Sequence, residues 1–121
     1  MLSMSRRPAQ IKIVNLEVGV PTVEQARLRL DYELQRARSE GFTAVKVIHG
    51  YGSSGVGGAL RTAIQGKLRA AAERGEVRAA IYGEDWRIAD EHAWPLLQKF
   101  PEWKADSDLG RGNRGITVVV L

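Results

Sequence analysis

The sequence predicts a small α/β sandwich in which helices connect the strands of a mainly parallel sheet. Three observations favour this class: runs rich in β-branched residues alternate with helical apolar patterns, a glycine follows each of the two main predicted helices, and a last apolar run closes the chain. Helical crossovers make consecutive strands parallel. The loops that follow those strands therefore gather at one edge of the sheet, where ligands bind in such folds.

The first half of the chain predicts a strand, a helix and a second strand. Residues 11–16 (IKIVNL) are rich in β-branched side chains, whereas residues 1–10 are expected to form a flexible tail. Thr22 and Gln25 have the spacing of a capping box, which predicts the start of the first helix. Residues 43–49 (TAVKVIH) predict an interior strand, because apolar side chains occupy adjacent as well as alternate positions.

The second half of the chain predicts a helix over residues 58–74, a third strand over 77–82 and a fourth over 115–121. Residues 83–112 separate the last two strands. That stretch is too long for a structureless loop in a compact domain, so we expect an insertion with its own element. Residues 11–121 are therefore expected to form one domain that carries this insertion.

The composition is that of an ordinary globular protein. Of the 121 residues, 44% are hydrophobic and 26% are charged, and cysteine is absent. The lack of cysteine excludes disulfides and thiolate metal sites, and no apolar run reaches the roughly 18 residues that span a bilayer. We therefore expect a cytoplasmic protein that does not act in a membrane.

The positive charge of the chain is concentrated in one region. The net charge is +4. Residues 44–78 contain six basic and two acidic side chains, so this segment accounts for the whole positive excess of the chain. A clustered basic surface favours an anionic partner such as DNA or RNA, and Arg61, Lys67 and Arg69 are the candidate phosphate contacts on the predicted helix. The alternative is a solvated helix face that is basic without a partner.

A loop rich in glycine and serine separates the second strand from the helix that follows it. Backbone N–H groups in such a loop can converge on an anion, and glycines with positive φ let phosphate oxygens approach the main chain. His49, at the end of the strand, can act as a general acid or base or donate to phosphate. The candidate phosphate-binding residues of the loop are Gly50, Tyr51, Gly52, Ser53, Ser54 and Gly55.

Two alternatives stay open for this loop. It can be a tight turn beside a buried, hydrogen-bonded histidine. It also fits the pattern G-x-G-x-x-G, which would make the chain a small nucleotide-binding protein, although 121 residues are too few for the two halves of a dinucleotide-binding fold.

The loop and its flanks resemble a known family. Residues 45–68, VKVIHGYGSSGVGGALRTAIQGKL, resemble the second signature of the small MutS-related (Smr) domain family: an apolar strand, His-Gly-x-Gly, a Ser/Gly-rich turn and a helix that opens with Leu-Arg. His49, Gly50 and Gly52 match its His-Gly-x-Gly, and Arg61 matches its basic residue early in the helix. The resemblance implies a two-layer β-α-β-α-β-β sandwich with a four-stranded mixed sheet, whose last strand runs antiparallel between the second and third.

The resemblance also implies a function. Members of the family bind nucleic acid, and some act as structure-dependent endonucleases that nick DNA or cleave RNA. The family's first signature, Leu-Asp-Leu-His, appears here as Val14-Asn15-Leu16-Glu17, so Glu17 replaces the histidine that belongs to the nuclease site. Binding is therefore the activity that carries over, and His49 and Glu17 are the catalytic candidates for cleavage.

Carboxylates at the same edge of the sheet offer a possible metal site. Glu17, His49 and either Glu84 or Asp85 each follow a predicted strand. Together they could hold Mg²⁺ or Mn²⁺ for phosphodiester cleavage. The alternative is that they are ordinary loop carboxylates near a histidine.

The insertion is rich in tryptophan and ends in a basic, glycine-rich stretch. Residues 89–100 predict a short helix with Asp90 as its cap, and all three tryptophans lie in the insertion. One hypothesis is a lid whose tryptophans stack on bases while Arg111 and Arg114 bind a single strand. The alternative is a mini-core that covers the open face of the sheet.

The first predicted helix offers a further contact surface. Leu28 and Tyr32 lie one turn apart and opposite the apolar stripe of that helix. They favour a function of another class, a non-catalytic protein-interaction or assembly module that meets a protein partner or forms a homodimer.

Overall fold

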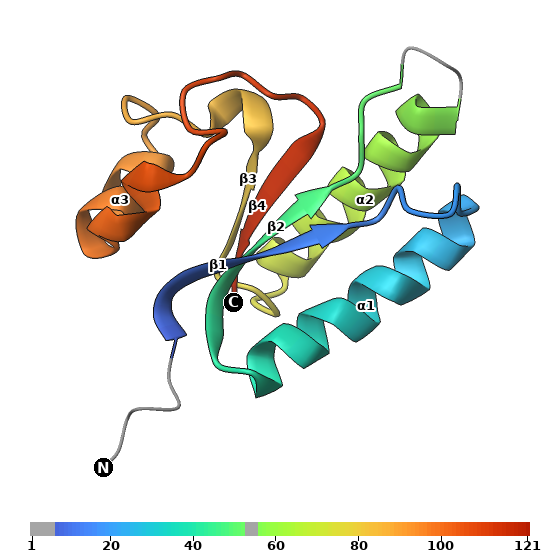
Figure 1. The fold of residues 1–121 in the computed structure, drawn as a ribbon, viewed down its shortest axis with the longest axis horizontal. Helices are drawn as coiled ribbons and strands as arrows, with labels where there is room; N and C mark the ends of the chain where they lie inside the picture. The colour runs from blue at the N-terminus through green and yellow to red at the C-terminus, as the bar shows by residue number, and fades with distance from the viewer. Residues whose placement is uncertain (1–6, 53–55) are drawn as a thin grey trace.

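A four-stranded sheet forms the centre of the molecule, with helices on both of its faces (Figure 1). The computed structural model describes residues 7–52 and 56–121. In chain order the elements are β1 (Arg7–Asn15), α1 (Val23–Ser39), β2 (Phe42–Ile48), α2 (Val56–Glu73), β3 (Ala79–Tyr82), η2 (Gly83–Asp85), α3 (Ala93–Lys99), η3 (Pro101–Ala105) and β4 (Ile116–Val120).

The strands follow the order β1-β2-β4-β3. β1 pairs parallel with β2, whereas β4 runs antiparallel to both of its neighbours, β2 and β3. The predicted sandwich with a mixed four-stranded sheet and an antiparallel last strand is therefore confirmed. All five residues of β4 are buried, because the strand is paired on both edges and covered on both faces.

The helices α1 and α2 cover one face of the sheet (Figure 1). The capping box predicted for α1 is confirmed: the Gln25 N–H donates to Thr22 Oγ1 at 3.1 Å, and the Thr22 N–H donates to Gln25 Oε1 at 2.9 Å. Among the helices of the described residues, none is long and apolar enough to cross a membrane. The core under these helices includes Leu30, Leu34, Val45, Val47, Ile64 and Leu68.

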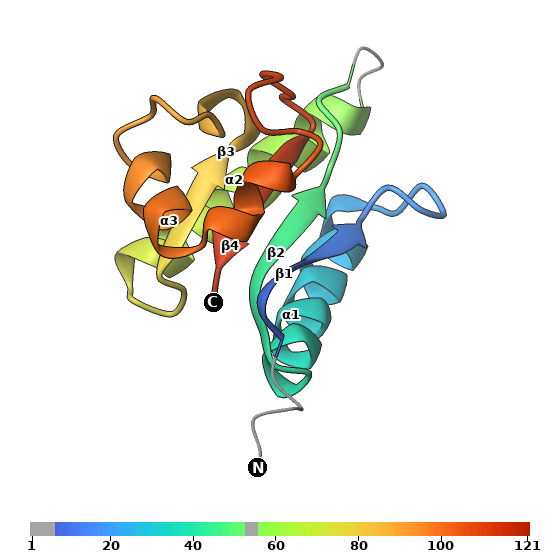
Figure 2. The same ribbon diagram turned by 60° about the vertical axis from the view of Figure 1, so that its left-hand side comes forward.

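The connection between β3 and β4 builds a second core on the opposite face of the sheet (Figure 2). Trp86 and Trp103 are buried there with ring centroids 6.5 Å apart, packed among side chains of α3, β3 and β4. The mini-core is thus confirmed, and the lid hypothesis is wrong for these two tryptophans because neither has a free ring face. Trp94 is half exposed.

The helix inside the insertion is shorter than predicted. It spans Ala93–Lys99 rather than residues 89–100. His92 occupies the N-cap position instead of the predicted Asp90, whose carboxylate accepts from the His92 N–H at 2.9 Å and from the Ala93 N–H at 3.0 Å. Pro95 falls in the first turn of the helix, where a backbone N–H has no intrahelical partner, so the proline does not disturb the middle.

Strand β1 begins earlier than predicted and takes in residues 7–10, which were expected to belong to the tail. Arg7 pairs with Phe42, and a register shift follows between Arg7 and Ile11. Because β1 is an edge strand, Pro8 can be accommodated in it without the loss of an interior ladder bond. Residues 1–6 lie outside the described residues.

A buried cation ties the insertion to the sheet. Lys46 on β2 is 3% exposed, and its Nζ lies 2.6 Å from Asp108 Oδ2 and 2.9 Å from Asp106 Oδ1. Burial opposes the charge of Lys46, but its hydrogen bonds to the two carboxylates outweigh burial and raise the pKa of this lysine. The Trp86 indole N–H also donates to Asp106, at 3.0 Å, so one carboxylate joins the sheet to the second core.

We expect Asp106→Ala to destabilise the protein by about 2 kcal/mol, because it removes one partner of a buried lysine and the acceptor of the Trp86 N–H. Urea unfolding followed by far-UV circular dichroism measures this change. Asp85→Ala, at an exposed aspartate in η2, is the matched control and should change stability by less than about 0.5 kcal/mol. If the two substitutions lowered the stability equally, the role of Asp106 in joining Lys46 and Trp86 would be contradicted.

The stability should also depend on pH through Asp108. The hydrogen bond from Asn113 and the one from Lys46 hold the pKa of this carboxyl below its ordinary value. Asp108 therefore stabilises the fold above a pH of about 4, where an unfolded aspartate ionises, and that contribution is lost as the pH falls through the folded-state pKa. The stability difference between wild type and Asp108→Asn should thus narrow as the pH falls from 6 to 3. If the stability of the two proteins changed with pH in parallel, Asp108 would not contribute to the pH dependence.

Candidate nucleic-acid interface

The loop after β2 and the loop before β4 lie side by side (Figure 2). The Gly115 carbonyl accepts from the His49 N–H at 2.9 Å and from the Gly50 N–H at 3.1 Å. These bonds continue the β2–β4 ladder past the end of β2. We call residues 49–52 and 111–115 the loop edge. Ser53, Ser54 and Gly55, also expected to bind phosphate, lie outside the described residues.

Gly50 brings the end of β1 against the loop edge. Its φ is +72°, a region that favours glycine, and a Cβ at this position would collide with the Glu17 carboxylate. The structure therefore places Glu17 beside Gly50, at the edge where the sequence predicted it. The positive φ is what makes this position favour glycine, because the Glu17 carboxylate is the end of an exposed side chain that can move.

His49 is fully buried, and both of its ring nitrogens have partners. Nδ1 lies 2.7 Å from the Gly50 carbonyl and Nε2 lies 2.9 Å from Thr117 Oγ1. Because a carbonyl only accepts, Nδ1 carries the proton, and Nε2 of the neutral ring accepts from the Thr117 hydroxyl. Burial lowers the pKa of His49, so the ring is neutral at pH 7. The geometry matches the alternative of a buried, hydrogen-bonded histidine that fixes the loop to β4.

The three cations predicted on α2 do not share one face. Arg61 Nη2 donates to Glu84 Oε2 at 2.7 Å, at the end of α2 nearer the loop edge. Lys67 lies 3.3 Å from the carboxylate of Asp31 on α1, and Arg69 lies over the ring of a tyrosine on β3. Arg61, Lys67 and Arg69 therefore do not form a single basic surface, because Lys67 faces α1 whereas Arg61 and Arg69 face β3 and the turn that follows it.

The proposed metal ligands do not converge. In the described residues there is no group of three or more histidine and carboxylate side chains that could hold a metal ion. Glu84 is paired with Arg61, both nitrogens of His49 are engaged, and Asp85 is exposed. A site for Mg²⁺ or Mn²⁺ built from Glu17, His49 and Glu84 or Asp85 is therefore not formed.

An open hollow of about 550 Å³ lies at the loop edge. It brings together Tyr51, from the predicted phosphate loop, with Arg111 and Arg114, from the end of the insertion. Tyr51 is 57% exposed, and both arginines are exposed as well. The remaining lining comes from Asp108, Gly112 and Asn113.

Asn113 is a structural residue of this hollow that the sequence analysis did not single out. Its Nδ2 donates to Asp108 Oδ1 at 2.9 Å, and its Oδ1 accepts from the Gly115 N–H at 2.8 Å. The second bond closes a local Asx turn, for which the sequence Asn-Arg-Gly is a recognisable signal. Asn113 thus holds the loop that carries both arginines.

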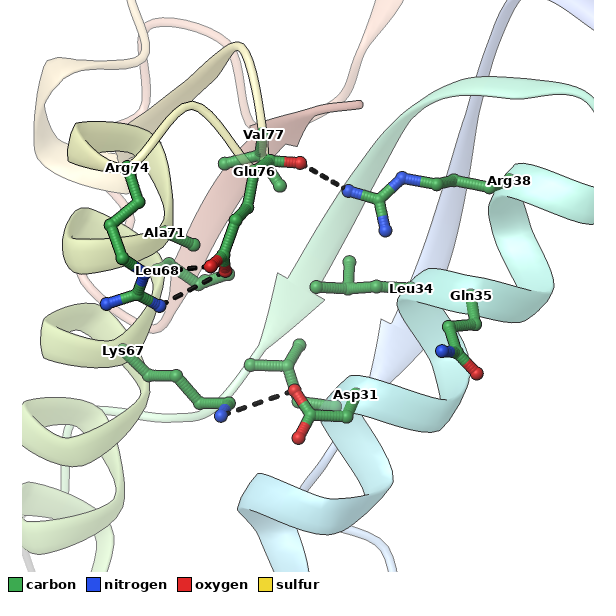
Figure 3. Close-up of a pocket in the computed structure, with 11 residues that line it drawn as sticks. Asp31, Leu34, Gln35, Arg38, Lys67, Leu68, Ala71, Arg74, Glu76 and Val77 are labelled. Carbon is green, nitrogen blue, oxygen red and sulfur yellow. Dashed lines mark hydrogen bonds and ion pairs between the residues drawn. The ribbon is translucent and has the colours of Figure 1, made fainter.

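A second hollow, of about 270 Å³, lies between α1 and the second half of α2 (Figure 3). Its cations are already engaged: Lys67 points to Asp31, Arg74 pairs with Glu76 at 2.8 Å, and Arg38 donates to the Glu76 carbonyl at 2.7 Å. The charged groups around this hollow thus satisfy one another. The loop edge is the stronger candidate for binding an anion.

Comparisons with known proteins agree with this geometry. The Smr domain profile matches residues 18–85, which include the first helix, the glycine-rich loop and the third strand. The chain is also similar to the crystal structure of the Smr domain of Thermus thermophilus MutS2, with a TM-score of 0.55 and 29% sequence identity, over 91% of this chain and 96% of that one. No match was found among curated protein sequences.

The profile covers more than half of the chain, and the structural match extends over nearly all of it. The chain therefore belongs to the Smr domain family.

Proposed function

We propose that this Smr domain binds DNA or RNA through the loop edge. The observation that carries the proposal is the hollow that joins Tyr51 to Arg111 and Arg114. Among the described residues, neither arginine makes a side-chain hydrogen bond or a close ion pair, and Arg111 acts on Asp108 only through its charge. Their guanidinium groups keep all their donors for phosphate oxygens, whereas Arg61 is bound to Glu84.

The geometry favours binding over cleavage. A general acid or base must reach the substrate, and His49 is buried with both ring nitrogens hydrogen-bonded inside the protein. Glu17 takes the place of the first-strand histidine of the family's nuclease signature and lies beside Gly50. The loop edge thus supplies contacts for phosphate without an accessible acid–base pair.

We expect the double substitution Arg111→Ala/Arg114→Ala to weaken nucleic-acid binding by about tenfold to a hundredfold, because two phosphate contacts are lost. The slope of log K against log salt should fall in magnitude by about 1.5 to 2. Fluorescence anisotropy with a labelled oligonucleotide at several salt concentrations measures both quantities.

The matched control is Arg27→Ala/Arg36→Ala, which removes two partly exposed arginines of α1 that do not line the hollow. It should leave the affinity within about threefold, since it lowers the net charge equally but touches no proposed contact. Equal losses in the two double variants would show that affinity follows net charge alone. Unchanged binding in the first variant, or binding only to a protein partner through Leu28 and Tyr32, would contradict the proposal.

Cleavage is tested with supercoiled plasmid and with RNA, each with and without Mg²⁺ or Mn²⁺. We expect the wild type to bind both substrates without converting them, because His49 has no free ring nitrogen. His49→Gln should lower the free energy of unfolding by about 2 kcal/mol, since it breaks a buried hydrogen-bond network, and should keep most of the affinity. Nicking by the wild type that disappears in His49→Gln would assign a catalytic role to this histidine instead.

A further inference from the structure

We propose that the hollow at the loop edge takes one unpaired nucleotide, with its base against the ring of Tyr51 and its phosphate on Arg111 and Arg114, and that the chain therefore prefers single-stranded nucleic acid to duplex. This inference rests on the proposed function and deepens it, because it names the class of substrate. Three features carry it: an exposed aromatic ring, a pair of unengaged guanidinium groups, and an open volume between them.

Tyr51 has the placement of a stacking platform. More than half of the residue is exposed, in contrast to Trp86 and Trp103, whose rings are buried in the second core. The ring also stands close to the backbone of the neighbouring loop, since a Cβ at Gly115 would lie 3.5 Å from Tyr51 Cδ1. Every base has a π-face, so an exposed ring of this kind stacks with little dependence on sequence.

The loop that carries the arginines is held in place before any ligand arrives. The Gly110 N–H donates to the Trp86 carbonyl at 2.8 Å, which fixes the start of the loop on the second core. The Asx turn of Asn113 fixes its end. A preorganised loop loses less conformational freedom on binding, which favours affinity.

The local charge also suits a phosphate. Asp108 is the carboxylate that lines the hollow, but it is engaged by Lys46 at 2.6 Å and by Asn113 at 2.9 Å. In the lining of the hollow and its ion-pair partners, Arg111, Arg114 and Lys46 outnumber the carboxylates of Asp106 and Asp108, whereas the Glu17 carboxylate lies beside Gly50 and outside the lining. The excess lies at the hollow itself, whereas the cations around the groove between α1 and α2 are engaged within the protein.

The volume favours an unpaired base. About 550 Å³ is in the range of small-ligand sites, the hollow is open to solvent, and the exposed Tyr51 is part of its lining. In a duplex both faces of an interior base are covered by its neighbours, so a base must first be unstacked and unpaired to reach Tyr51. A single strand avoids that cost, which is the physical basis of the preference.

The test measures anisotropy with a 12-nucleotide single strand and with a blunt-ended duplex of 12 base pairs, at the same salt concentration. We expect the wild type to bind the single strand at least about tenfold more tightly than the duplex. Tyr51→Ala should lower the affinity for the single strand about tenfold and the affinity for the duplex less than about twofold. Tyr51→Phe, which keeps the ring, should keep both affinities within about threefold of wild type. Tyr32→Ala, at an equally exposed tyrosine on α1, is the matched control and should change neither affinity.

A second readout detects stacking itself. An oligonucleotide that carries 2-aminopurine should lose fluorescence on binding the wild type and Tyr51→Phe, but not on binding Tyr51→Ala at saturating concentration. Absence of binding to either nucleic acid would overturn the proposed function. Equal affinity of the wild type for both forms, or equal losses on both in Tyr51→Ala, would overturn the unpaired-nucleotide site and leave nucleic-acid binding standing.

Discussion

The insertion of β4 between β2 and β3 is the constraint on which the candidate interface depends. This strand is buried along its whole length, so its position is fixed by both cores at once. The residues just before it must therefore arrive beside the end of β2, where the Gly115 carbonyl accepts from two successive N–H groups. Through this one backbone contact a loop from the middle of the chain and a loop near its end become a single surface.

Polar contacts then hold that surface from both sides of the sheet. On the side of α2, His49 joins the Gly50 carbonyl to Thr117, which makes the histidine a structural part of the loop edge. On the opposite side, Lys46 holds Asp106 and Asp108 and so fixes the insertion. The histidine is therefore inside the protein, whereas the ring of Tyr51 and the guanidinium groups of Arg111 and Arg114 line the hollow and are exposed. This arrangement favours a surface that recognises nucleic acid over one that cuts it.

Local signals made much of this fold predictable from the sequence. The capping box at Thr22 and the β-branched strands each depend on residues close together in the chain, and both were confirmed. The pairing of Lys46 with Asp106 joins residues 60 positions apart, and no local pattern encodes it. For the same reason, no local pattern predicted that Tyr51 and the two arginines would line one hollow. Placing Lys67 and Arg69 on one basic surface was an avoidable error. Side chains two residues apart on a helix point in directions that differ by roughly 200°.

The central claim is that nucleic acid contacts the loop edge, and an ¹H–¹⁵N correlation spectrum recorded during titration with a short single-stranded oligonucleotide tests it most directly. The account predicts that the largest shifts fall on the amides of residues 50–52 and 111–115, including the side-chain signal of Asn113. The amides around Leu28 and Tyr32, whose side chains are also exposed, should stay in place. Shifts that concentrate on α1, or on the groove between α1 and α2, with the loop edge unchanged would contradict the account.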